Sequence, residues 1–423
     1  MRILIVNTSE NAGGAAVAAN RLMKALNHNG ERAQMLVRNK VTDNSSIIRL
    51  GCGWLQQWRF LWERFVIYAY SLFSRKHLFE IDIACAGADI TSLKEFKEAD
   101  IIHLHWINQG MLSLTDIRRI LNSGKPVVWT MHDIWAATAI CHLTLGCNKF
   151  KSGCSQCKYL PSVFFADMAK RTWNAKREML KGHNVHFVAC SKWLAGEARK
   201  SALLTAQQIS SIPNPIDTSV FCKTSKSEAR NRIGLPQDKR IILFVSQRTT
   251  NRNKGMQYLM EACQKLASQY PDMCENTCVA ILGSHADEVV ADLLFAAYPL
   301  GYTSDTNRIV DVYNACDVFV LPSLSENLPN TIMEAMSCGV PCVGFNVGGI
   351  PEMIDHQKNG YVARFRDSDD LAQGIRWGLF DSDFPTLCNN ARQKVLHNYS
   401  QNIVAMKYVE LYSHAIAEKR YKL

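Results

Sequence analysis

Short runs of apolar residues alternate with longer amphipathic segments along the first half of the chain. The runs lie at Arg2–Asn7, Gln34–Val37, Ile101–Leu104, Val127–Met131 and His186–Ala189. A Gly-Gly turn and a helical pattern follow the first run. Because short continuous apolar runs are typical of strands buried on both faces, this alternation predicts a parallel sheet wound with helices.

The second half repeats the alternation after a proline-rich connector at 209–217. Its apolar runs lie at Arg240–Val245, Cys278–Leu282, Asp317–Val320 and Cys342–Phe345, and a closing helical pattern follows over 402–417. We therefore predict an α/β protein of two doubly wound, Rossmann-like domains. We expect the first at 1–210, with 400–423 returning to it, and the second at 218–398.

Composition fits a globular protein and excludes a disordered or fibrous one. The 423 residues exceed what one hydrophobic core organises, and 47% are hydrophobic. The 48 Lys and Arg outnumber the 38 Asp and Glu, which favours an anionic partner such as a nucleotide or a phospholipid surface, although a solvated basic surface would look the same. Basic and aromatic residues are not interleaved as on nucleic-acid-binding folds, so we expect no nucleic acid partner.

The start of the chain does not resemble a signal peptide. The apolar core at Ile3–Val6 is too short, and no stretch reaches the about 20 apolar residues that cross a bilayer. The 15 cysteines of such a chain are expected to be reduced thiols. We therefore expect a cytoplasmic protein.

The loop and helix that follow the Asp317–Val320 run carry the strongest chemical pattern. Glu326 lies in the loop, and Glu334 lies in the helix. Pro329 has no N–H, so the first free amides of this helix are those of Asn330 and Thr331, which suit a phosphate. The two carboxylates would then bind hydroxyls of a sugar and a ribose.

Several motifs together resemble one enzyme family. These motifs are Leu321-Pro-Ser-Leu-Ser-Glu-Asn-Leu-Pro-Asn-Thr-Ile-Met-Glu, Asn253-Lys-Gly, Gly301-Tyr-Thr-Ser-Asp, Tyr313-Asn-Ala-Cys-Asp and Gly348-Gly-Ile-Pro-Glu. The set is similar to retaining glycosyltransferases of the GT-B fold, in the large family four that uses nucleotide sugars, over nearly the whole chain. The resemblance implies two Rossmann-like domains facing across a cleft, with the last helix packing back on the first domain.

The resemblance implies a donor site mainly in the second domain. Arg248 and Lys254 are implied to neutralise the diphosphate as it leaves, which stabilises the transition state without a metal. Gln247 stands where the family usually has Gly, so Arg252 competes with Arg248 for this role. The remaining implied donor contacts are Gly13, Gly14, Asn327, Leu328, Asn330, Thr331 and Glu334.

In the first domain, Trp129-Thr-Met-His-Asp resembles the family's Thr-x-His-Asp. His132 is implied to lie near the transferred sugar and the acceptor, where an imidazole can donate to a hydroxyl. Asp133, His103 and His105 are implied on the acceptor side. The implied catalytic set is thus His132, Glu326, Arg248 and Lys254, with no cofactor for catalysis.

Four clustered cysteines follow His132. Cys141, Cys147, Cys154 and Cys157 end in a C-x2-C pair, which is typical of a structural zinc knuckle. His142 could replace one thiol, and unbound thiols or a redox pair are the alternatives. With the upstream His-Asp-x-Trp, the segment resembles colanic-acid-type polysaccharide glycosyltransferases, which points to capsule or exopolysaccharide synthesis.

The segment 54–79 is rich in aromatic residues and also carries Arg59, Arg64, Arg75 and Lys76. Its apolar residues recur at helical spacing on one stripe: Trp54, Trp58, Leu61, Phe65, Tyr68 and Leu72. Such a stripe fits either a helix that lies on a membrane or a helix packed in the core. The first alternative would place the protein at the inner membrane as a peripheral protein.

We expect a retaining glycosyltransferase that moves a sugar from a UDP- or GDP-linked donor to a saccharide or lipid-linked saccharide acceptor. In this family the leaving phosphate is generally drawn as taking the acceptor's proton, so no protein nucleophile is needed. One alternative is a GT-B-fold sugar-nucleotide epimerase, which releases free nucleotide without an acceptor. Another is a non-catalytic sugar-nucleotide-binding component of a polysaccharide assembly complex.

Overall fold

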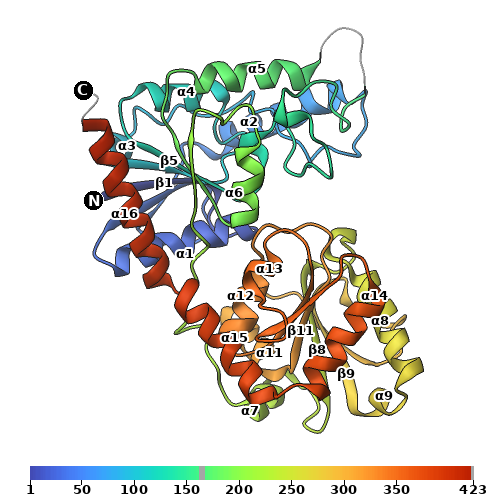
Figure 1. Cartoon of the computed structure of the whole chain (residues 1–423). Helices are drawn as coiled ribbons and strands as arrows, with labels where there is room; N and C mark the ends of the chain where they lie inside the picture. The colour runs from blue at the N-terminus through green and yellow to red at the C-terminus, as the bar shows by residue number, and fades with distance from the viewer. Residues whose placement is uncertain (162–166, 421–423) are drawn as a thin grey trace. The chain divides into compact units, whose positions relative to one another are not determined.

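The computed structural model describes residues 1–161 and 167–420, and the chain divides into two compact units. The first unit comprises Met1–Pro215 together with the chain from Val404 onward, and the second comprises Ile216–Ile403. Each unit is a central sheet covered by helices (Figure 1). Residues 421–423, which belong to the segment predicted to return to the first domain, lie outside the described residues.

A seven-stranded parallel sheet organises the first unit. Its strands are β1 (Arg2–Ser9), β2 (Arg32–Asn39), β3 (Ile47–Arg49), β4 (Ile101–Leu104), β5 (Val127–Met131), β6 (His186–Ala189) and β7 (Gln208–Ser211). They lie in the order β3-β2-β1-β4-β5-β6-β7. The chain therefore winds outward from β1 in one direction and from β4 in the other, which leaves the topological switch point between β1 and β4.

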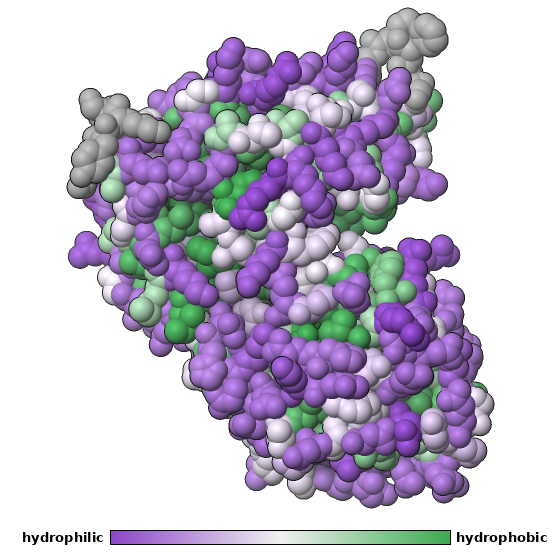
Figure 2. Space-filling view, in the orientation of Figure 1, coloured by the Kyte–Doolittle hydropathy of each residue, from purple (hydrophilic) through white to green (hydrophobic). Residues whose placement is uncertain are grey.

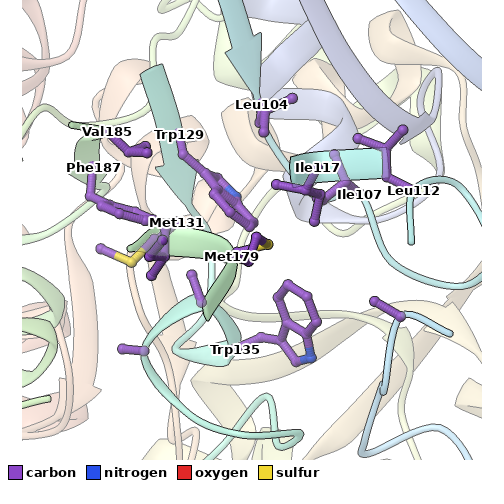
Figure 3. Close-up of a cluster of buried hydrophobic side chains, with 14 of the residues drawn as sticks. Leu104, Ile107, Leu112, Ile117, Trp129, Met131, Trp135, Met179, Val185 and Phe187 are labelled. Atoms are coloured by element: carbon purple, nitrogen blue, oxygen red, sulfur yellow. The ribbon is translucent and has the colours of Figure 1, made fainter. Parts of the chain in front are cut away.

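Helices cover both faces of this sheet. On one face, α1 (Gly14–His28) and α16 (Gln401–Arg420) pack on the sheet, and Tyr408 and Tyr412 of α16 are buried there. The opposite face holds the larger core, in which Trp129 stacks on Phe187 (Figure 3). The helices on that face are α2 (Gly53–Tyr70), α3 (Lys94–Glu98), α4 (Leu114–Asn122), α5 (Met168–Leu180) and α6 (Lys192–Arg199), with the short η1 (Trp135–Ala137) and η2 (Lys149–Lys151) in connecting loops.

Helix α2 turns its aromatic stripe outward. Trp54 is 75% exposed, and Trp58 and Phe65 are each 55% exposed, whereas Glu63 and Arg64 are buried. The core-packed alternative for this stripe is therefore wrong. No helix in residues 1–161 or 167–420 is long and apolar enough to cross a membrane.

A six-stranded parallel sheet organises the second unit. Its strands are β8 (Arg240–Arg248), β9 (Thr277–Ser284), β10 (Ala296–Gly301), β11 (Val318–Leu321), β12 (Cys342–Phe345) and β13 (Gly360–Ala363). They lie in the order β10-β9-β8-β11-β12-β13, so the switch point falls between β8 and β11.

Helices α8 (Met256–Gln269) and α14 (Ser368–Arg376) pack with Phe244 and Val320 in the core of the second unit. The other helices are α7 (Lys226–Ile233), η3 (Arg252–Lys254), α9 (Asp272–Asn276), α10 (Ala286–Val290), α11 (Thr306–Ala315), α12 (Asn330–Ser337), α13 (Ile350–Met353), η4 (Trp377–Asp381) and α15 (Phe384–Asn398). The visible face of each unit is largely hydrophilic (Figure 2).

The predicted fold class is confirmed, since each unit is a doubly wound parallel sheet and α16 packs on the first sheet. The sequence did not predict β3, β7, β10 and β13, which lie at or near sheet edges. Strand β7 lies partly in the segment interpreted as a connector. Three of its four residues are polar and none is buried, because an edge strand is paired on one side only.

Candidate functional site

The best-defined candidate site lies at the switch point of the second sheet, where ligands bind in open α/β sheets. Arg248 is the last residue of β8, and Arg252 and Lys254 lie in η3 just after it. The loop that follows β11 carries Glu326. The chain thus brings the predicted cations and one predicted carboxylate to the same edge of the sheet.

The loops after β8 and β11 are joined through their backbones. Asn253 Nδ2 donates to the Ser325 carbonyl at 2.9 Å, and the Leu324 N–H donates to the Asn253 carbonyl at 2.8 Å. Gly255 has a φ of 74°, and a Cβ built on it would lie 1.8 Å from the Pro322 carbonyl oxygen. Only glycine permits this approach, so the Lys254 loop is fixed against the Glu326 loop.

A third loop, after β12, joins the same cluster. Gly348 has a φ of 58°, and a Cβ on it would lie 1.7 Å from the Glu326 carbonyl oxygen. The Gly349 N–H donates to the Asn327 carbonyl at 2.8 Å. Three loops from neighbouring strands therefore hold the backbone of Glu326 and Asn327 in place.

Lys254 and Glu326 form an ion pair with each other. The Lys254 side chain is 30% exposed and that of Glu326 is 12% exposed. A lysine ammonium has three N–H donors, so Lys254 can keep this partner and still donate to an anion. Glu326 accordingly orients the ammonium besides offering its own carboxylate oxygens.

Glu334 lies in α12, where it is buried. The Tyr313 hydroxyl, itself buried, donates to Glu334 Oε2 at 3.0 Å. Burial together with the Glu334 carboxylate raises the pKa of Tyr313 well above its usual value, so the phenol stays a donor. Tyr313 stands in one of the motifs quoted above, but nothing in the sequence indicated that it positions Glu334.

The other predicted donor contacts surround the start of α12. Asn330 begins the helix after Pro329, as the proline pattern predicted. Leu328 is buried, whereas the remaining members are half-exposed: Asn327, Asn330 and Thr331. Sequence reasoning missed Ser323, whose hydroxyl is buried after β11 and has no hydrogen-bond partner among the described residues.

The first unit presents a glycine turn after β1. Gly13 has a φ of 87° and precedes α1, which begins at Gly14. Among the described residues, no atom beyond the two chain neighbours lies within 4 Å of a Cβ built on Gly13, so the turn is open, and both glycines are exposed. The positive φ explains why glycine is needed at Gly13, and the open surroundings leave its backbone accessible.

His103 does not lie at the site that sequence reasoning assigned to it. Its Nδ1 is bonded to the Tyr412 hydroxyl at 2.7 Å, and its Nε2 to the Thr130 hydroxyl at 2.7 Å. The ring is fully buried under α16. Because both nitrogens are engaged in the core, His103 is a structural residue and not an acceptor-side one.

His105 and His132 lie together after β4 and β5. His105 Nδ1 is 2.9 Å from His132 Nε2, and His132 Nδ1 is 3.4 Å from the sulfur of Cys190. Burial lowers the pKa of His132 to about 4 and that of His105 well below its usual value. Both rings are therefore neutral at pH 7 and can share protons only through hydrogen bonds.

Asp133 is held by three donors. Its carboxylate accepts from Trp106 Nε1 at 3.0 Å, from the Trp135 N–H at 2.8 Å and from His142 Nδ1 at 2.7 Å. Burial opposes ionisation, but the His142 charge and these hydrogen bonds outweigh it and lower the pKa of Asp133. Asp133 therefore orients this loop as an anion.

His142, the alternative to one of the four thiols, lies between two carboxylates. Its Nε2 is 2.7 Å from Asp82, and its Nδ1 is bonded to Asp133, so both ring nitrogens are engaged. Burial alone would lower the pKa of His142, yet the carboxylates of Asp133 and Asp82 raise it to about 10. His142 is thus a cation between two anions.

The buried face of α2 continues this network. Arg64 pairs with Asp82, and Glu63 accepts backbone N–H donors from Ile83 at 3.1 Å and from Gly110 at 2.9 Å. Charged side chains of α2 thereby connect through Asp82 and His142 to the loop of His132 and Asp133. The exposed aromatic helix and the histidine loop are parts of one packed assembly.

The four clustered cysteines lie near one another but are not assembled as a ligand set. Burial, with Cys157 and Cys154 nearby, raises the pKa of Cys141 to about 12, and burial likewise raises that of Cys154 to about 11. Within the described part of the chain, no three of the sulfurs lie within 4.8 Å of one another. Four thiols are nevertheless a donor set that zinc prefers, and the zinc site stays a prediction.

Two family models match the chain. Residues 12–220 match Glycosyltransferase Family 4, and residues 225–395 match Glycosyl transferases group 1. The first match covers the strands from β2 to β7, and the second covers the complete six-stranded sheet.

Curated relatives share part of the sequence. An uncharacterized glycosyltransferase of Methanocaldococcus jannaschii is 31% identical over 45% of this chain and 49% of that protein. D-inositol 3-phosphate glycosyltransferase 2 of Catenulispora acidiphila is 27% identical over 50% of this chain and 52% of that protein. The chain thus spans about half the length of the curated relatives it matches.

Solved structures share the fold along the chain. Sucrose-phosphate synthase of Thermosynechococcus elongatus has a TM-score of 0.67 at 19% identity, covering 98% of this chain and 99% of that one. Anabaena HepE in complex with UDP-glucose has a TM-score of 0.62 at 17% identity, covering 100% and 99%. The chain therefore has the GT-B fold of these neighbours, and it contains a Glycosyltransferase Family 4 domain followed by a Glycosyl transferases group 1 domain.

Proposed function

We propose that the protein is a glycosyltransferase that moves a sugar from a nucleotide diphosphate sugar, UDP- or GDP-linked, to a saccharide or lipid-linked saccharide. The observation that carries this proposal is the Lys254–Glu326 pair at the switch point of the second sheet, beside the start of α12. The paired cation, the N–H groups at the start of α12 and the two glutamates are the groups that a diphosphate, a hexose and a ribose require.

The donor half of the reaction rests on charge. The HepE structures contain UDP and UDP-glucose, and HepE shares this fold. We infer that Lys254, with Arg248 or Arg252, neutralises the diphosphate as the glycosidic bond breaks. The configuration is retained if the acceptor attacks from the same face and the leaving phosphate takes its proton, which needs no protein nucleophile.

The acceptor half rests on the first unit. A neutral His132 can donate to or accept from a sugar hydroxyl without adding charge, and His105 with Asp133 fixes its loop. The open turn at Gly13 and Gly14 provides backbone that a donor phosphate can approach.

We infer that α2 contacts the cytoplasmic face of a membrane. Trp58 stacks on Trp62 with 5.7 Å between ring centroids, on the exposed stripe described above. Leu72 and Phe73 follow with positive φ and are 60% and 66% exposed, close to Arg75 and Lys76. Aromatic rings beside basic side chains suit the interface of an anionic bilayer and a lipid-linked acceptor.

The His-Asp-x-Trp and cysteine segment supports a colanic-acid or capsular type of polysaccharide synthesis. We propose that Cys141, Cys147, Cys154 and Cys157 bind one structural zinc, because four soft thiols lie in one half-buried segment. Its role would be to hold the loop beyond His142.

The proposal is tested by separating nucleotide binding from transfer in two charge-removing variants. Glu334→Gln should weaken the binding of the free nucleoside diphosphate, measured by calorimetry, because its carboxylate reaches the ribose. Glu326→Gln should leave this affinity close to wild type and lower kcat in an acceptor-dependent transfer assay. The wild-type donor is first chosen from a panel of UDP- and GDP-sugars by thermal shift, since a bound donor raises stability by mass action.

Glu275→Gln, on the exposed surface of α9, is the matched control and should change neither quantity. If both site variants keep wild-type kcat and nucleotide affinity, the donor site is elsewhere. Release of nucleotide without an acceptor would indicate an epimerase, and binding without turnover would indicate a non-catalytic component.

A further inference from the structure

A second cluster of titratable side chains lies at the amino end of β6 in the first sheet, at the opposite end of the strand from the His132 loop. His186 is the first residue of β6, and His414 and Glu418 are one turn apart on α16. Their ligand atoms all lie within 4.8 Å of one another, and this is the one such group of His, Cys, Asp and Glu among the described residues. None of these three residues belongs to the sites described above.

The three side chains converge on one point. His186 Nε2 is 3.1 Å from Glu418 Oε2, and His414 Nδ1 is 3.6 Å from Glu418 Oε1. Ligand atoms about 2.0 to 2.1 Å from a tetrahedral zinc ion are roughly 3.3 Å apart. The observed spacing therefore needs little side-chain movement to admit an ion.

Neighbouring groups prepare the carboxylate for this role. Gln208 Nε2 donates to Glu418 Oε1 at 3.0 Å, and Asn184 Nδ2 donates to Oε2 at 3.1 Å. Hydrogen bonds of this kind orient metal-ligating carboxylates.

The cluster borders a cavity with room for water ligands. The cavity has a volume of 360 Å³ and is lined in part by His183, Asn184, His186, Glu418 and Lys419. Lys419 also lines this cavity and adds a positive charge to its wall. Two imidazoles, one carboxylate and open positions form a donor set that suits zinc and similar divalent ions.

We propose that His186, His414 and Glu418 bind a divalent transition-metal ion of the zinc class, which clamps the end of α16 to β6. The site lies at the amino end of β6, whereas Cys190 and the His132 loop follow its carboxyl end, roughly 13 Å away for a four-residue strand. The ion would therefore stabilise the first unit without touching the reacting groups. This inference is independent of the proposed transfer reaction.

The test uses the full chain, stripped of metal with a chelator and titrated with Co2+. A site of nitrogen and oxygen ligands gives ligand-field bands without thiolate charge-transfer bands, which distinguishes it from the four cysteines. We expect one thiolate-free equivalent of Co2+, displaced by Zn2+, and a higher unfolding temperature with metal.

His414→Ala and Glu418→Gln should each weaken this binding by at least about tenfold and remove the metal-dependent rise in unfolding temperature. His414 is 61% exposed, so its loss should not prevent folding. His183→Ala, which lines the same cavity but is not a ligand, is the matched control and should keep wild-type binding. Absence of a thiolate-free Co2+ equivalent, or equal affinity in His414→Ala and wild type, would overturn the proposal.

Discussion

The carboxyl ends of the two sheets carry different chemistry at equivalent positions. In the second unit, the Lys254–Glu326 ion pair is partly exposed, and three loops touch backbone to backbone around it. In the first unit, His105 and His132 are neutral because burial disfavours their charged forms. The charged groups near these histidines are Asp133 and His142, which form an ion pair with each other.

The difference shows how one topology can present either a charged or a neutral set of side chains to a ligand. A partly solvated ammonium whose loop cannot move suits a diphosphate, since little reorganisation is needed when charge develops. Neutral imidazoles suit hydroxyl groups, which carry no charge to balance. Substitutions can test the close backbone contacts and the lysine charge in the second unit and the neutral histidines in the first.

Loss of the close backbone contacts around the Lys254–Glu326 pair should have the largest effect on stability. Gly348→Ala puts a methyl group where the Glu326 carbonyl lies, at 1.7 Å, and also requires a positive φ. We expect a loss of about 2 to 4 kcal/mol in the free energy of unfolding, measured with urea. Gly234→Ala, in the same unit, has a left-handed backbone with a φ of 75° and a ψ of 33° but no described atom within 4 Å of the added Cβ, and should cost only about 1 kcal/mol. Equal losses in the two variants would contradict the close approach.

Loss of the positive charge of Lys254 should have the largest effect on turnover. Lys254→Ala is expected to lower kcat/KM by on the order of 100-fold, equivalent to about 2.7 kcal/mol, because a partner of the leaving diphosphate is lost. Steady-state kinetics with the chosen donor measures this effect, and Arg248→Ala and Arg252→Ala show which arginine shares the role. Lys358→Ala, on the exposed surface of the same unit, is the control. Wild-type kinetics in Lys254→Ala would remove this lysine from the site.

Because His132 is neutral in the folded protein, the free energy of unfolding should fall at acidic pH. The pKa of His132 is lowered from 6.5 to about 4, so the unfolded chain takes up a proton that the folded chain does not. The stability that this residue contributes is therefore complete above about pH 6.5 and is lost as the pH falls toward about 4. In His132→Gln, the loss of unfolding free energy between about pH 7 and pH 5 should be smaller by about 2 kcal/mol.

Urea titrations at a series of pH values measure this slope without requiring equal stability of the two proteins. His397→Gln, an exposed histidine of α15, provides the comparison and should leave the slope near that of wild type. A His132→Gln slope equal to the wild-type slope would show that His132 titrates normally.

The exposed stripe of α2 extends the comparison to the surface of the first unit. Replacing Trp58 and Trp62 by serine should weaken binding to vesicles of anionic phospholipid by roughly tenfold, because two large apolar side chains are lost. Flotation with vesicles measures the bound fraction. Trp193→Ser, a 40% exposed tryptophan of α6, is the control. Unchanged flotation of the double variant would contradict membrane contact through α2.

The sequence predicted the central strands because strands buried on both faces leave continuous apolar runs. It predicted Lys254 and Glu326 through motifs, but not that they pair, since the two residues are 72 positions apart. The sequence offered His142 as an alternative to one of the four thiols, whereas its partners Asp82 and Asp133 meet it only in the fold. For α2, periodicity identified the aromatic stripe but not whether it faces the core or the solvent. The opposite face is buried because Glu63 binds partners that lie 20 or more residues away.

The division of the chain has a consequence for how it is made. The face of the first sheet that α1 covers is completed by Val404, Tyr408 and Tyr412 of α16, which a ribosome synthesises after the entire second unit. The second unit is one continuous stretch and can complete its sheet as soon as it has emerged. The unit that is translated first is therefore expected to finish folding last, and until then the apolar face around Ile3, Ile5 and Val128 is a surface for chaperones to cover.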